Sequence, residues 1–202
     1  MPEAESKKRV SIPVETIRQI QQSCVEHDDD MRWLIALISN TGMRLAEAAG
    51  LHINDIKLEK DIPYVDVKPH TWRSLKTKGS QRQVPLVGAS LWAAQRIEAN
   101  ASSCFAFPRY TDHDRCNANS ASNALNKWLH ANFRKDIVIH GFRHAMRDRL
   151  RAVSCPSEMI DQIGGWSPGK VGEGYGEGYS VTQMKHWMTR ITVKPTESGS
   201  DI

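Results

Sequence analysis

The sequence predicts an α+β fold that is mainly α-helical, with one small antiparallel β-sheet. Two observations indicate this class. Apolar residues recur at helical spacing over most of the chain. Residues 52–86 differ, because "DIPYVDVK" alternates as a strand does, and "RQVPL" after "KTKGSQ" is typical of the return strand of a hairpin.

The first expected helices have clear boundary signals. Ile12-Pro13 leads into a helix over residues 14–26. The acidic run Asp28-Asp29-Asp30 then begins a strongly apolar helix, since carboxylates favour the positive end of a helix dipole. This helix breaks at Thr41-Gly42 near residue 40, and a short helix over 45–49 follows.

After the sheet, helical spacing resumes. The expected helices cover residues 89–99, 120–131, 142–153, 157–163 and 181–192. The last carries an apolar stripe that either its own domain or a neighbouring protomer can cover. Flexible ends are expected at 1–11 and 193–202, around one domain over 12–192.

Composition bounds the function. At 202 residues, 40% of them hydrophobic, with mean hydropathy -0.50, the chain suits a soluble globular protein. A net charge of +4 and a pI near 8.9 favour a polyanionic partner. The four cysteines lack CxxC spacing, which favours reduced thiols in a cytoplasm, and the eight histidines form no metal-binding pattern. We therefore expect no metal and no cofactor. No segment is suited to span a membrane.

One glycine-rich stretch is conspicuous. "GGWSPGKVGEGYGEGYS", residues 164–180, holds seven of the thirteen glycines and two of the four tyrosines, Tyr175 and Tyr179. Glycine favours loops and hinges, so this is either a surface loop or a tether that lets a phenol move.

Two segments concentrate charge on apolar helices. In "VIHGFRHAMRDRLRAV", a helix from Gly141 places Arg143 and Arg147 on one face, with His140 at its entrance. In "NTGMRLAEAAGL", Arg44 begins an otherwise apolar helix. A buried arginine needs an anion, which is either Glu47 or a ligand phosphate that Glu47 orients it toward. The first segment alone is equally consistent with a solvated basic helix.

The hairpin "LKTKGSQRQVPL" carries Lys76 and Lys78 about its tip. A lysine on a hairpin is either a solvated edge charge or a proton donor that reaches across a cleft.

Together these motifs resemble the catalytic domain of the tyrosine recombinases, the phage integrase family, over residues 12–192. The family's first arginine, in T-G-x-R-x-x-E, corresponds to Arg44, with Glu47 as its acid. The hairpin lysine corresponds to Lys76, or to Lys78 in another register. The H-x-x-R motif corresponds to His140 and Arg143.

In the glycine-rich stretch, the position usually held by a second histidine corresponds to Trp166. The nucleophile corresponds to Tyr175, with Tyr179 as the alternative. Trp166 and Gly141 depart from the commoner residues of the family. The region that resembles the catalytic domain begins near residue 12, so we expect a truncated or minimal member without the amino-terminal DNA-binding domain that usually precedes it.

The resemblance implies the DNA breaking-rejoining fold and a site-specific recombinase that acts on double-stranded DNA. It further implies a monomer in solution that forms a homo-tetramer on DNA, in a prokaryotic or phage-encoded cytoplasmic setting. Arg44 and Arg143 would clamp the scissile phosphate, His140 would act as base and Lys76 as acid, and Tyr175 would form a 3′-phosphotyrosyl bond. Trp166 would donate a hydrogen bond and pack.

Two other interpretations use the same residues. A type IB topoisomerase would relax supercoils with nearly the same set. A non-catalytic module of this fold would use its basic face only to contact phosphates.

Overall fold

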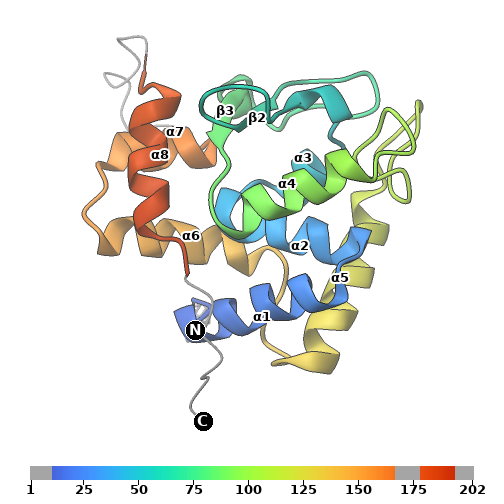
Figure 1. Ribbon diagram of the computed structural model, residues 1–202, viewed down its shortest axis with the longest axis horizontal. Helices are drawn as coiled ribbons and strands as arrows, with labels where there is room; N and C mark the ends of the chain where they lie inside the picture. Colours follow the sequence, from blue (N-terminus) through green and yellow to red (C-terminus); the bar gives the residue numbers. More distant parts are fainter. Residues whose placement is uncertain (1–10, 167–177, 194–202) are drawn as a thin grey trace, which may run out of the picture.

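The computed structural model describes residues 11–166 and 178–193, arranged around the buried helix α2 (Asp30–Thr41). Every residue of α2 from 34 to 41 is buried. The helices packed against it are α1 (Val14–His27), α3 (Leu45–Ala49), α4 (Ala89–Ala99) and α6 (Gly141–Ala152) (Figure 1). An apolar helix of this kind is stable because neighbours cover it on all sides.

The ends of α2 are formed by the residues that the sequence indicated. The Asp29 side chain caps the helix by accepting a hydrogen bond from the backbone N–H of Arg32 at 3.0 Å. At the other end Gly42 has a φ of 60°, the left-handed conformation that glycine adopts without steric cost. The break at Thr41-Gly42 is confirmed.

The sheet has three antiparallel strands in the order β1 (Ile56–Lys57), β2 (Tyr64–Val67), β3 (Arg82–Pro85). Val65 pairs with Ile56 on one side and with Val84 on the other, and all three side chains face the core. The expected hairpin is therefore β2–β3. Short 3-10 helices, η1 (Ile53–Asp55) and η2 (Lys78–Ser80), precede β1 and β3.

The remaining helices are α5 (Ala118–Asn132), α7 (Ser157–Gly164) and α8 (Val181–Arg190). Their bounds differ from the expected ones by one or two residues. Helix α8 packs against β3 of its own chain (Figure 1). It buries Met184 and Met188, and the Arg149 guanidinium donates to the Ile191 carbonyl just past its end at 3.0 Å.

The mainly helical fold with a small sheet is thus as predicted. Within residues 11–166 and 178–193, no helix is both long and apolar enough to cross a membrane. No group of three or more histidine, cysteine or acidic side chains in the same ranges is placed to hold a metal ion. The cysteines at 24, 104, 116 and 155 are not disulfide-bonded.

Candidate active site

Arg44 lies at the start of α3, immediately after the turn that ends α2. Gly42, in that turn, has a positive φ and packs closely against α6. A Cβ there would lie 2.5 Å from the Met146 side chain of α6. Helix α6 therefore lies close to the α2–α3 turn, and the positive φ explains why a glycine stands two residues before the arginine.

Glu47 holds the Arg44 guanidinium from one turn further along α3. Arg44 Nη1 donates to Glu47 Oε1 at 2.7 Å, and the Arg44 backbone N–H donates to Glu47 Oε2 at 2.9 Å. On the far side of Glu47, Arg82 Nη2 donates to Oε2 at 2.9 Å. The carboxylate is only 3% exposed. Its charge can persist at this depth because two arginines neutralise it.

The pKa of Glu47 follows from this setting. Burial alone would raise the pKa of the carboxyl group. The charge of Arg82 and the hydrogen bonds from Arg82 and Arg44 outweigh burial, and they hold the pKa below its ordinary value. Glu47 is therefore ionised at neutral pH and orients Arg44.

Arg143 projects from the first turn of α6 toward the same α2–α3 turn. Its Nη1 donates to the Gly42 carbonyl at 2.7 Å, two residues before Arg44. The residue is 3% exposed, and its Nη2 is buried without a hydrogen-bond partner in the part of the chain that the structure describes. A buried donor gains from a hydrogen bond, so this amino group, like the buried Nε of the nearby Arg147, is available to an added acceptor.

Trp166 lies beside Arg143 and Arg147 just past the end of α7. The two guanidinium carbons are 4.2 Å and 4.8 Å from the centre of its ring, within cation–π distance. Gly164 permits this placement, because a Cβ on it would lie 1.8 Å from the ring. The glycine pair before Trp166 is thus partly a packing requirement.

We call Arg44, Arg82, Arg143 and Arg147 the arginine cluster. Burial, followed by the charges of Arg44 and Arg82, lowers the pKa of the Arg143 guanidinium to about 9. Among the described residues, the carboxylates paired with the cluster are Glu47 and Asp161. Four cations against two anions leave an excess of positive charge, which an added anion would neutralise.

The other residues selected from the sequence make fewer described contacts with the arginine cluster. His140 is exposed at the start of α6, where its carbonyl accepts from the Arg143 backbone N–H and its ring lies 5.0 Å from that of His144. Lys76 is exposed in the β2–β3 connection. Lys78 lies in η2, but its side chain is outside the described part of the structure.

The two tyrosines differ. Tyr175 lies outside the described residues. Tyr179 donates its hydroxyl to Glu158 at 3.2 Å, and its backbone N–H and carbonyl bond to the Gln162 amide at 2.8 Å and 2.7 Å. Burial, then the bond to Glu158, raises the pKa of the Tyr179 phenol. Each of these effects disfavours the phenolate that a nucleophile requires.

Sequence reasoning missed Arg82 and Ser80. Arg82 is buried in β3, and the Ser80 hydroxyl accepts from Arg44 Nη1 at 3.1 Å. A signal for Arg82 was available. In "RQVPL" the strand period places Arg82 on the same inward face as Val84, and an inward arginine needs an anion.

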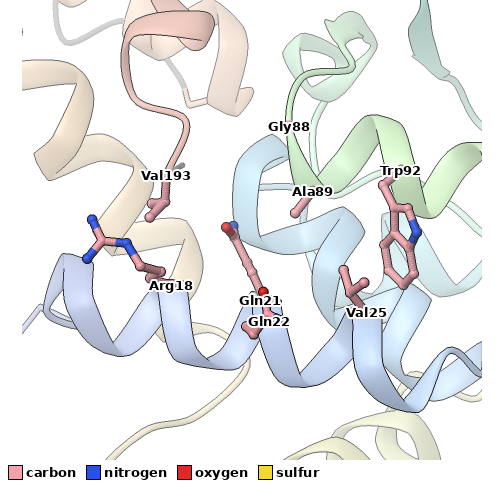
Figure 2. Close-up of a pocket in the computed structure, with 8 residues that line it drawn as sticks. All are labelled: Arg18, Gln21, Gln22, Val25, Gly88, Ala89, Trp92 and Val193. Atoms are coloured by element: carbon pink, nitrogen blue, oxygen red, sulfur yellow. The ribbon is translucent and has the colours of Figure 1, made fainter. Parts of the chain in front are cut away.

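A separate cavity of about 280 Å³ lies between α1 and the start of α4 (Figure 2). Val25 and Trp92 lie at one end, and Arg18 and Val193 lie at the other. None of the arginine cluster lines it, so the cavity is not part of the candidate site.

Solved structures share this fold. Tn1549 transposon integrase in complex with transposon right-end DNA has 16% identity and a TM-score of 0.59, over 92% of this chain and 63% of that one. The same integrase with circular intermediate DNA has 16% identity and a TM-score of 0.62, over 95% and 70%. XerA recombinase has 17% identity and a TM-score of 0.55, over 93% and 61%.

At these identities the likeness shows a shared fold. The chain spans less than two thirds of the first of these integrase chains and of XerA recombinase. No curated protein matches the sequence.

The fold is that of the catalytic domain of tyrosine recombinases. The family model described as the phage integrase family matches residues 11–175, most of the chain. The protein therefore belongs to the phage integrase family.

Proposed function

We propose that this chain cleaves and rejoins DNA strands in site-specific recombination, through a covalent bond between Tyr175 and a 3′ phosphate. Membership of the phage integrase family supports recombination as the reaction class. The observation that carries the chemistry is the buried, unpartnered Nη2 of Arg143 beside Arg44. A phosphodiester is the anion that DNA would bring to these donors.

The arginines supply electrostatic catalysis. Attack on phosphorus increases negative charge on the non-bridging oxygens, and pre-placed cations stabilise that charge without reorganising. Arg44 is held by Glu47, Ser80 and the Gly165 carbonyl, and Arg143 is held by the Gly42 carbonyl. Both guanidiniums keep N–H groups for the phosphate. Trp166 packs on Arg143 and restricts its position, a role that needs no titratable group.

The covalent step is a transesterification. The Tyr175 oxygen bonds to phosphorus while the bond from phosphorus to the 5′ oxygen breaks. The phenolic proton passes to His140, and the leaving 5′ oxygen takes a proton from Lys76 or Lys78. Attack by another strand's 5′ hydroxyl reverses each transfer and releases Tyr175. Since the phosphotyrosyl bond conserves the energy of the original ester, rejoining needs no nucleotide.

The test is formation of a covalent adduct on a trap substrate. A pool of randomised duplexes is labelled and nicked on one strand, so that a short 5′-hydroxyl fragment diffuses away after cleavage. The wild-type chain is expected to acquire label that resists SDS, without added Mg²⁺ or ATP. Sequencing of the trapped DNA identifies the site.

Two variants assign the nucleophile. Tyr175→Phe is expected to abolish the adduct. Tyr179→Phe is expected to retain it, because the phenol of Tyr179 contributes one hydrogen bond to Glu158. Adduct formation that survives in Tyr175→Phe and disappears in Tyr179→Phe would reassign the nucleophile. A wild-type chain that binds the pool and never forms adduct would overturn the proposal.

A further inference from the structure

The Arg82 guanidinium contacts three of the segments that shape the proposed phosphate site, namely α3, η2 and the end of α7. We infer that Arg82 is a positioning residue for strand cleavage, which fixes Arg44 through Glu47 and fixes the end of α7 through the Ile163 carbonyl. The inference rests on the proposed function and extends it to a residue that does not itself touch the DNA.

The contacts of Arg82 join three segments at one point. Its Nη2 donates to Glu47 Oε2 at 2.9 Å, its Nη1 to the Ser80 carbonyl at 2.6 Å, and its Nε to the Ile163 carbonyl at 2.8 Å. Nη1 also lies 3.4 Å from Glu47 Oε1. Arg82 is 7% exposed. Its charge is therefore used inside the protein and not on a DNA phosphate.

Arg44 uses the same three segments. Besides Glu47, it donates to the Ser80 hydroxyl at 3.1 Å and to the Gly165 carbonyl at 3.1 Å. The two arginines thus bind two nearby carbonyls at the end of α7, where backbone acceptors lack helical partners and positive charge is favoured. Trp166 follows directly, so Arg82 also fixes the ring that packs on Arg143.

The shape of the side chain explains why arginine stands here. A guanidinium presents its donors in a planar fork, and Arg82 uses them on acceptors from α3, η2 and α7. A lysine ammonium at this position would keep the charge beside Glu47 but cannot reach all three segments together. Charge and positioning are therefore separable by substitution.

The charge of Arg82 and its positioning contacts should affect the pH profile of cleavage differently. The charged groups that face Glu47 are Arg44 on its own helix, Arg82 on β3, Arg73 in the β2–β3 connection and Arg143 on α6. Arg82 is the foremost of the groups that lower the pKa of Glu47 against the effect of burial. Without Arg82 the pKa of Glu47 should rise, so Arg44 should lose its ionised partner at a higher pH.

The experiment compares the pH profile of adduct formation in wild-type, Arg82→Met and Arg82→Lys chains on the trapped duplex. Arg82→Met is expected to reduce the cleavage rate roughly 10²-fold at neutral pH, the order of loss caused by small misplacement of a catalytic group. The Kd for the same duplex should change far less. The ionisation of Glu47, which adds a limb on the acidic side of the one set by the proposed base His140, should move to higher pH. Arg82→Lys should slow cleavage but leave that limb near its wild-type position.

If Arg82 only stabilised the fold, its substitution would change the pH profile in a different way. Loss of folded protein lowers the amplitude of the reaction but does not move the acidic limb. Arg149→Met is the matched control, because Arg149 is also buried and bonds to carbonyls, yet it pairs with no carboxylate among the described residues. It should lower thermal stability and leave the limb in place. In the double variant Glu47→Gln with Arg82→Met, no limb from this carboxyl should remain.

Carbon NMR of labelled glutamate measures the pKa of Glu47 without any turnover. A higher pKa in Arg82→Met supports the inference, and an unchanged pKa overturns it. If the wild-type chain cleaves and both Arg82 variants cleave equally fast, the assignment of Arg82 alone is overturned. If the wild-type chain forms no adduct, the proposed function fails, and the positioning role for Arg82 in cleavage fails with it.

Discussion

Arg143 illustrates how a single residue can be costly to the folded state and necessary for function. It is buried, three other arginines repel it, and one of its amino groups has no partner in the described ranges. Such an arrangement is expected where a protein binds an anion, because the ligand completes a site that the free protein leaves unsatisfied.

Substitution of Arg143 should therefore separate activity from stability. In Arg143→Met we expect adduct formation to fall roughly 10²–10³-fold, as when one oxyanion donor is removed. The free energy of unfolding should change by less than about 1 kcal/mol, because relief of the repulsion from like charges offsets the loss of the hydrogen bond to the Gly42 carbonyl. Chemical denaturation and the trap assay measure the two effects.

Arg149→Met provides the comparison at this scale. Its guanidinium donates to the Ser39 and Ile191 carbonyls, which the variant would leave unpaired, so we expect a loss of about 1–3 kcal/mol in unfolding free energy. If Arg143→Met proves as unstable as Arg149→Met, the arginine is there for the fold, and the explanation by an absent phosphate fails.

At the scale of elements, the end of α7 holds the site together. Arg44 and Arg82 bind its carbonyls, and Trp166 folds back over Gly164 to reach Arg143 and Arg147. The amide of Gln162, on the same helix, binds the backbone of Tyr179. Both described ends that flank residues 167–177 are therefore attached to one short helix.

Gly164→Ala tests this element. The added Cβ would lie 1.8 Å from the Trp166 ring, so the ring must leave its place on Arg143. We expect a loss of about 1–3 kcal/mol from overpacking, together with slower adduct formation. Fluorine NMR of labelled tryptophan should show one resonance displaced. Gly79→Ala is the matched control because nothing lies within 4 Å of its Cβ position. An unmoved Trp166 resonance would contradict the packing described here.

At the scale of the molecule, the position of α8 bears on assembly. The apolar stripe of α8 covers its own β3, and the Arg149 guanidinium binds the carbonyl just past the end of the helix. A single protomer therefore buries Met184 and Met188 without a neighbour. The sequence left open whether this stripe is covered by its own domain or by a neighbouring protomer. In the free chain its own domain covers it.

We expect the chain to be a monomer in solution and to assemble as a tetramer when two duplexes with the trapped site are supplied. The reason is stoichiometric, because reciprocal exchange between two duplexes breaks four strands and each break consumes one tyrosine. Light scattering, with and without DNA, measures the change. A complex that keeps one protomer per site at high protein concentration would contradict this expectation.

Much of this protein follows from local sequence. The capped start of α2, its glycine stop and the β2–β3 hairpin are set by short-range rules, so all were predicted. Motif spacing likewise predicted the family. It also selected Arg44, Glu47, Arg143 and Trp166, which the structure brings together but whose roles in catalysis stay predictions. Tyr175, His140 and the hairpin lysines remain predictions, since no contact in the described residues tests their roles.

Only the tertiary structure decided which groups share a site and how much free energy the burial of each group costs. Glu47 and Arg82 are 35 positions apart, and Arg44 and Gly165 are 121 apart. No local rule relates positions so distant. Their pairing depends on how α3, β3 and α7 pack, and so does the unsatisfied amino group of Arg143. The sequence determined the elements and the types of charged group, whereas burial of those groups against one another determined their pKa values and their excess of positive charge.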